Sequence, residues 1–378
     1  MIELTRPLLF EARPHRGEGM DNRLRLDLQP LTRRESGKLV AEILQKAEGV
    51  PDDLSALLVS NTEGNPFYVE ELVKMLIEQS VIDASGDSWT IDPERLGEIS
   101  IPSTLTGVLQ SRLDRLSPRE MRVLQRASVI GRDFWDSALT GFESSVNVPT
   151  ILESLRRKEI LFRKERSTFG DSVEFVFKHA LLRDVTYETL LIEERRQWHL
   201  ETAEWLAEAK DRRRNEYLAL IAEHFEKGAS PEISAVWYQR AADQARRTHA
   251  LETAERLYLK VLKIVNELGG DIGESGIDPE DEMNCRQSLG LVFHAQARFK
   301  DSIGMFEELL RMADRLGSTR WQAEAHWGLS VSQFDSGDSR SSLKARKMPS
   351  ALPAIAEVRA ATNRLCCRRK GCSARVVH

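Results

Sequence analysis

The 378-residue sequence has few cysteines and no long hydrophobic run. Three of its four cysteines, Cys366, Cys367 and Cys372, crowd the last residues, and Cys285 stands alone in the body of the chain. This spacing is not that of a disulfide framework, so we expect a reducing compartment, the cytoplasm. No apolar stretch approaches the length of a membrane span, and the first residues lack the apolar run of a signal peptide. We therefore expect no membrane association.

An excess of basic residues is also missing. The chain carries 54 Lys and Arg against 59 Asp and Glu, a net charge of −5. Proteins dedicated to nucleic acids usually carry a basic footprint, so this balance argues against a nucleic-acid partner, although a small basic face remains compatible with it. With 41% hydrophobic residues, a chain of this length is long enough for two or three domains with ordinary cores.

Familiar catalytic and metal-binding patterns are absent as well. There is no Gly-x-Ser-x-Gly elbow and no His-Glu-x-x-His motif. The eight histidines are scattered, and His199 and His224 have no ligand partner at metal spacing. The carboxylates of Glu70 and Glu71 are adjacent, so on a helix they point apart, and we interpret both as solvated. The sequence thus predicts no catalytic residue and no metal site.

The stretch Glu63-Gly64-Asn65-Pro66 predicts a sharp corner between two helices. Gly64 can take the left-handed conformation that ends a helix. Asn65 is a good N-cap, and Pro66 suits the first helical position because its missing N–H would be unpaired there anyway. Ordinary packed helices are also joined in this way, so the corner alone does not identify a function.

Apolar periodicity predicts a mainly α fold with a helical lid, a winged-helix domain and an α-solenoid. In the lid segment we expect a short strand over Leu24–Leu28 and a capping box at Thr32. Ser117 predicts a second capping box. Helices around 134–139 and 151–158, followed by strands at 160–162 and 173–177, indicate the winged helix. The expected segments are 1–24 (a strand end and loop, which the resemblance described below implies to be the remnant of a nucleotide-binding domain), 25–100 (lid), 101–195 (winged helix), 196–338 (helical repeats) and 339–378 (basic tail).

A weak internal repeat supports the solenoid. Small and aromatic residues recur at the positions of a tetratricopeptide (TPR) repeat, because small residues let two helices approach and aromatic rings fill the gaps between repeats. The two copies are Tyr238, Ala241, Ala242, Ala245, Ala254, Tyr258 and Leu289, Gly290, Phe293, Ser302, Phe306. A third copy begins at Trp327 and decays after Asp335. The segment 339–378 then holds ten Lys/Arg and one acidic residue, which fits either a basic tail or an out-of-frame ending, and we favour the second.

Taken together, these features resemble the large bacterial STAND-type predicted ATPases, in which a class III adenylate/guanylate cyclase domain often precedes the ATPase part and TPR repeats follow it. The resemblance covers roughly residues 1–335. It rests on the order of the expected elements and on the amino-acid sequences of four stretches: 63–72, 105–116, 128–132 and 177–188.

The resemblance implies roles for five residues. Arg6 is similar to the sensor arginine that reads the terminal phosphate, and it can equally be a solvated loop arginine. Gly64, Asn65 and Pro66 resemble the corner that closes over adenine. His179 resembles a winged-helix histidine that holds bound ADP in some members, although a histidine satisfied beside the wing fits equally well.

The same resemblance implies ATP or ADP with Mg as the cofactor of the family. The phosphate-binding loop, Gly-x-x-x-x-Gly-Lys-Ser/Thr, is absent from this sequence, and Ser36-Gly37-Lys38-Leu39 does not replace it. We therefore expect no tight nucleotide binding and no ATP hydrolysis by this chain alone, and nucleotide binding only if the missing domain is supplied.

Three functions remain open at this stage. The first is a regulatory and interaction part of a signalling ATPase that binds a protein or peptide with its repeats. The second is a winged-helix transcriptional regulator that contacts DNA through Arg156, Arg157 and Lys158. The third is an ATPase or cyclase component that is completed in trans.

Overall fold

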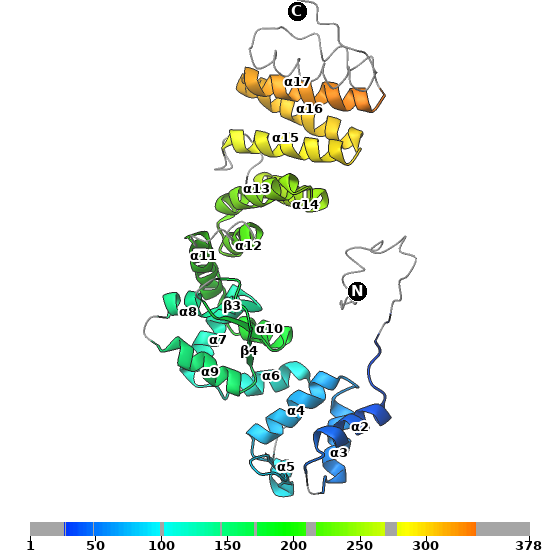
Figure 1. Cartoon of the computed structure of the whole chain (residues 1–378), viewed down its shortest axis with the longest axis vertical. Helices are drawn as coiled ribbons and strands as arrows, with labels where there is room; N and C mark the ends of the chain where they lie inside the picture. Colours follow the sequence, from blue (N-terminus) through cyan, green and yellow to red (C-terminus); the bar gives the residue numbers. More distant parts are fainter. Residues whose placement is uncertain are drawn as a thin grey trace, which may run out of the picture. The chain divides into compact units, whose positions relative to one another are not determined.

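The computed structural model describes residues 26, 28–47, 49–98, 102–143, 146–169, 172–208, 217–268 and 278–337. Arg6, the predicted remnant at 1–24 and the predicted tail at 339–378 lie outside the described residues. The chain divides into two compact units, Met1–Arg115 and Leu116–His378. Helices dominate both, which confirms the mainly α fold class (Figure 1). Among the described residues, no helix has both the length and the apolar character that crossing a membrane requires.

The first unit is a small helical cluster with one short hairpin. Its apolar core gathers Val40, Leu58, Leu72 and Leu76 from three helices. The predicted capping box is confirmed, because Thr32 Oγ1 accepts from the Glu35 N–H at 3.3 Å and the Glu35 carboxylate accepts from the Thr32 N–H at 2.8 Å. The elements are α2 (Arg33–Ile43), α3 (Asp52–Asn61), α4 (Pro66–Glu78), β1 (Ile82–Asp83), β2 (Thr90–Ile91), α5 (Pro93–Glu98) and α6 (Leu105–Leu113).

A buried ion triad attaches α6 to α4. The Arg112 guanidinium pairs with the carboxylates of Glu71 and Glu78, and both Arg112 and Glu71 are buried. The interpretation of Glu71 as solvated is therefore wrong: it faces α6, whereas Glu70 is exposed. Helix α6 belongs to the first unit, which ends at Arg115, whereas the expected segment 101–195 grouped it with the winged helix.

The expected strand over Leu24–Leu28 is not found in the described part of it. Leu26 and Leu28 belong to no strand and are 75% and 90% exposed. Among the described residues no neighbouring strand is present to complete a ladder of hydrogen bonds with them, so alternation of apolar residues alone does not make a strand there.

The second unit begins with helices and a small antiparallel sheet. Ser117 caps α7 in the predicted capping box with Glu120, which is confirmed. The hairpin β4–β5 is also found, and the sheet order is β3-β5-β4. Phe134 pairs with Phe175 in this sheet, so the helix expected around 134–139 starts only at Asp136. The elements are α7 (Pro118–Ile130), β3 (Asp133–Trp135), α8 (Asp136–Phe142), α9 (Val148–Arg157), β4 (Leu161–Arg163), β5 (Glu174–Phe177) and α10 (Ala180–Glu188).

The rest of the second unit is a series of long helices, each packed against the next. Three of the turns between them share one geometry. Ala229, His249 and Ala297 each adopt a left-handed conformation with φ of 57°, 60° and 59°. In each turn the residue that follows the left-handed one donates its N–H to the carbonyl of the residue five positions before it. This is the hydrogen bond that ends a helix in a Schellman motif. The helices are α11 (Ile192–Glu208), α12 (Leu218–Lys227), α13 (Pro231–Arg247), α14 (Leu251–Glu267), α15 (Pro279–Ala295), α16 (Phe299–Leu316) and α17 (Thr319–Asp335).

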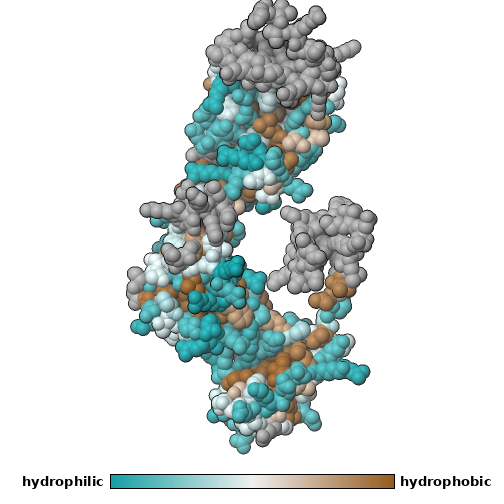
Figure 2. Space-filling model, viewed as in Figure 1, coloured by the Kyte–Doolittle hydropathy of each residue, from teal (hydrophilic) through white to brown (hydrophobic). Residues whose placement is uncertain are grey.

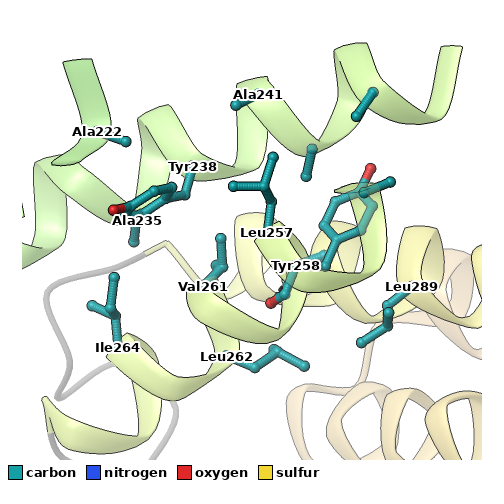
Figure 3. Close-up of a cluster of buried hydrophobic side chains, with 14 of the residues drawn as sticks. Ala222, Ala235, Tyr238, Ala241, Leu257, Tyr258, Val261, Leu262, Ile264 and Leu289 are labelled. Carbon is teal, nitrogen blue, oxygen red and sulfur yellow. Dashed lines mark hydrogen bonds between the residues drawn. The ribbon is translucent and has the colours of Figure 1, made fainter. Parts of the chain in front are cut away.

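Close packing of rings against small residues holds these helices together. The Tyr258 and Leu257 side chains reach from α14 toward α13, and Leu289 of α15 joins the same apolar cluster (Figure 3). In the next hairpin the Phe306 ring lies against Gly290 and Gly328. A Cβ atom at these glycines would lie 2.9 Å and 2.2 Å from the ring. The glycines therefore set how closely α15 and α17 approach α16.

This packing predicts opposite effects for two glycine substitutions. Gly328→Ala places a methyl group 2.2 Å from an atom of the Phe306 ring. We expect this overpacking to lower the free energy of unfolding by about 1–3 kcal/mol. Gly304→Ala in α16 is the matched control, because nothing lies within 4 Å of its Cβ. It should gain about 0.5–1 kcal/mol from helix propensity. Urea denaturation of both variants measures the difference, and equal gains in both would contradict the packing described.

Candidate functional site

The corner at Gly64 has the geometry that its sequence predicts. Gly64 is left-handed, with φ of 76°. Asn65 is the N-cap of α4, and its Oδ1 accepts from the Phe67 N–H at 3.1 Å. Pro66 occupies the first helical position. Each residue has the local role that its type suggests, so the corner itself is confirmed while its use for a nucleotide stays a prediction.

A second stretch of backbone fixes this corner. The Leu31 N–H donates to the Gly64 carbonyl at 2.8 Å. A Cβ on Gly64 would lie 2.2 Å from the Leu31 carbonyl oxygen, so no other residue fits at this distance. The sequence did not predict this role of Leu31, because the contact is made by its backbone N–H and carbonyl, which other residue types also have. The contact means that the segment before α2 and the α3–α4 corner hold each other in place.

The side chains that the corner exposes at Asn65 and Pro66 are small and uncharged. Gly64 is buried, whereas Asn65 and Pro66 are exposed next to the acidic Glu63. A proline ring offers an apolar surface for a planar group, and the Asn65 side chain keeps donors that the capping bond does not use. The corner can thus support a ring, but it supplies no cation for phosphate groups.

His179 lies in the second unit, whereas Gly64, Asn65 and Pro66 lie in the first. It is the N-cap residue of α10, and the Arg183 N–H donates to its carbonyl. Arg183 pairs with Asp184 at 3.1 Å, as a local ion pair, and its Nε donates to the Ser128 carbonyl at 2.7 Å. The structure therefore ties the residues around His179 to α7.

Two of the three cations proposed for DNA contact are bound to carboxylates. Arg156 pairs with Glu153 at 2.6 Å, and Lys158 pairs with Glu120 at 2.8 Å. Burial disfavours the charge of Glu120, but hydrogen bonds from Lys158, Ser117 and Ser154 prevail and lower the pKa of this carboxyl to about 2. Phosphate groups would have to compete with these pairs, so the geometry does not favour DNA binding by α9.

The repeats offer the broadest candidate surface. Helix α15 contacts both α13 and α17, so these three helices lie side by side. At 100° per residue, the buried residues of α13 and α15 fall on one side of each helix. The opposite stripes form a surface that we call the α13–α15 face. It consists of Val236, Arg240, Asp243 and Arg247 on α13, with Asn284, Ser288, Leu291 and Ala295 on α15.

The α13–α15 face is polar with a positive bias. Arg240 lies over the Trp237 ring at 4.7 Å, and Arg247 is exposed in the last turn of α13. The Asp243 carboxylate already accepts from the Tyr258 hydroxyl at 2.5 Å. Asn284 can both donate to and accept from a peptide backbone. The view in Figure 2 shows mostly hydrophilic side chains over α13–α17. Such a surface suits a polar peptide better than an apolar ligand.

No cluster of three or more His, Cys, Asp or Glu among the described residues has the geometry of a metal site. One group of polar residues nevertheless escaped the sequence analysis. His199 of α11 and His224 of α12 are both buried and face each other, with 2.8 Å between their Nδ1 atoms. Their separation of 25 residues matches no ligand spacing, and only the packing of α11 on α12 brings them together.

The sequence matches no protein-family model and no curated protein. Two solved structures are distantly similar. One is a Signal Transduction ATPase with Numerous Domains (STAND) protein with a tetratricopeptide repeat sensor from Pyrococcus horikoshii, with a TM-score of 0.34 and 15% identity, covering 85% of this chain and 60% of that one. The other is BtubC (BKLC) from P. vanneervenii, with a TM-score of 0.27 and 12% identity, covering 70% of this chain and 96% of that one.

The Leu31 contact predicts that two left-handed glycines respond differently to a methyl group. Gly64→Ala should lower stability by about 2 kcal/mol more than Gly49→Ala, because overpacking adds to the backbone strain that both share. Gly49 has a φ of 77° and no atom within 4 Å of its Cβ. Thermal unfolding of the two variants tests this. Equal losses would mean that the corner does not depend on Leu31.

Proposed function

We propose that this chain is the regulatory and interaction part of a STAND-type signalling ATPase, and that its helical repeats bind a protein or peptide. The observation that carries the proposal is the serial packing of α12–α17, with turns of one geometry at Ala229, His249 and Ala297 and with α13, α15 and α17 side by side. Stacked hairpins bury one side of each helix and leave the other as a continuous surface, which is how repeat proteins present binding faces.

The chemistry of the α13–α15 face narrows the partner. Arg240 and Arg247 place two positive charges at the surface, against the one negative charge of Asp243, which accepts a hydrogen bond from the Tyr258 hydroxyl. Asp281 lies near Arg240 and also moderates this charge. Burial is the main reason that the pKa of Asp281 is raised, Asp278 and Glu280 add to the effect, and Arg240 opposes it. An extended peptide that carries a carboxylate near a free backbone amide fits these donors.

In this proposal the first unit senses nucleotide state and does not perform chemistry. Asn65 and Pro66 would cover the adenine of ATP or ADP that another domain holds with Mg. The nucleotide roles that the resemblance implies for Arg6 and His179 remain predictions. The sequence contains no Gly-x-x-x-x-Gly-Lys-Ser/Thr loop, so backbone amides that could cradle the phosphates would come from that other domain. The winged-helix role of α7–β5, completion in trans and fusion to a cyclase domain remain predictions.

A peptide selection tests the interaction. A random peptide library displayed on phage is selected on the purified chain, and enriched peptides are measured by fluorescence anisotropy. We expect acidic peptides that bind the wild-type chain and lose about tenfold in affinity with Arg240→Ala/Asn284→Ala, because hydrogen bonds to a charged group contribute about 1.5–3 kcal/mol.

The matched control is Lys263→Ala, an exposed cation on the other side of the hairpin, in α14. Its affinity should stay within about twofold, since surface charges away from a contact have small effects. An equal loss with Lys263→Ala, or failure to enrich any peptide, would contradict binding by the α13–α15 face. Turnover of radiolabelled ATP above background by the purified chain would contradict the regulatory role.

A further inference from the structure

A chain of polar groups crosses the interior of the second unit where α10, α11 and α12 meet. The Tyr187 hydroxyl lies 2.9 Å from His199 Nε2, and His199 Nδ1 lies 2.8 Å from His224 Nδ1. The side chains come from three consecutive helices. His199 and His224 are only 1% and 3% exposed. Helix α12 leads directly into the repeats, so this chain of groups is part of the joint between the repeats and the preceding helices.

The short contact between the two imidazoles holds one proton. If His199 Nδ1–H donates to His224 Nδ1, His199 Nε2 is left as an acceptor for the Tyr187 hydroxyl. A neutral imidazole has one donor and one acceptor nitrogen, so both contacts are satisfied when both rings are neutral. When both rings are charged, each Nδ1 carries a hydrogen and the two N–H groups point at each other. The geometry therefore excludes two protonated rings at this distance.

The surroundings also oppose positive charge. Burial, the charge of His224 and the cations Lys227, Arg183 and Arg195 lower the pKa of His199 to about 3. Burial and Lys227 lower the pKa of His224 to about 4, with Arg183 adding to the effect, whereas Glu223 and the backbone of Ile130 oppose it. Arg183 and Arg195 lie on the Tyr187 ring at 4.7 Å and 4.6 Å, so cations flank the chain of groups from α10 and α11.

We propose that the Tyr187–His199–His224 chain is an acid-released latch, which holds α12 on α11 while both imidazoles are neutral and lets α12 separate when they take up protons. This device is independent of the peptide-binding proposal, because it lies outside the α13–α15 face. It would make the connection between α11 and the repeats that begin after α12 responsive to pH.

The direction in which pH changes the stability of the closed joint follows from the direction of the two pKa shifts. An exposed histidine has a pKa near 6.5, and both imidazoles have lower values in the closed joint. The closed joint is thus fully favoured above pH 6.5, and its advantage falls as the pH drops from 6.5 toward about 4 for His224 and about 3 for His199. At pH 5 the opening equilibrium should shift by about 30-fold for each imidazole that becomes exposed.

Amide hydrogen exchange of the full chain tests the latch. Protection factors of α12 amides should fall by at least about 30-fold between pH 7.5 and pH 5.0. Helix α14 (Leu251–Glu267) contains no histidine and is the internal reference, which should change by less than about threefold because no group in it titrates in this range. Helix content measured by far-ultraviolet circular dichroism should be retained. Unchanged protection of α12, or a cooperative loss of all helices, would overturn the proposal.

The variant His199→Gln/His224→Gln removes both titrating groups and keeps polar side chains. Its α12 protection should no longer depend on pH, and an unchanged dependence would overturn the proposal. If this variant does not fold, ¹⁵N shifts of the wild-type imidazoles replace it. The midpoints of His199 and His224 should lie at least one pH unit below the value near 6.5 of an exposed histidine, and midpoints near 6.5 would overturn the latch.

Discussion

Close approach between segments, at positions where no Cβ atom fits, is the constraint on which this structure depends. Gly64 lies against the Leu31 backbone, Gly228 against the Leu200 side chain, and Gly290 and Gly328 against the Phe306 ring. Each of these glycines lies next to an atom less than 3.0 Å from where its Cβ would be. Without them the α3–α4 corner would open and the repeat helices would separate. The corner and the approach of α15 and α17 to α16 depend on these short contacts, since protein interiors tolerate little change in volume.

Polar contacts then determine which helices are joined. The Arg112 triad attaches α6 to α4. In the second unit, Trp198 of α11 lies between Arg122 and Arg126 of α7, at 4.4 Å and 4.1 Å. The buried Arg112–Glu71 pair adds little net stability, because desolvation offsets most of the attraction between the two charges. The His199–His224 pair follows the same principle at the next joint, with the difference that the imidazoles take up protons when the joint opens below about pH 6.5.

Local features were predictable from the sequence and tertiary contacts were not. The corner at Gly64, the capping boxes at Thr32 and Ser117 and the β4–β5 hairpin depend on neighbouring residues, and the structure contains all of them. Strand β3 was missed because Phe134 is held in the sheet by Phe175, 41 positions later in the sequence. Glu71 was taken as solvated because its partner, Arg112, is equally remote in sequence. Of the candidate site residues, the local geometry of Gly64, Asn65 and Pro66 could be derived, whereas their proposed use depends on a nucleotide-binding domain.

Mapping where a selected peptide binds is the most direct test of binding by the α13–α15 face. Amide hydrogen exchange of the full chain would be measured with and without a saturating peptide. If the peptide binds the α13–α15 face, protection of backbone amides from exchange increases in α13 and α15, which carry Arg240 and Asn284, and changes little in α14 and α16. Protection confined to α14 and α16, or to the first unit, would show that the repeats do not bind through the α13–α15 face and would contradict the proposed function.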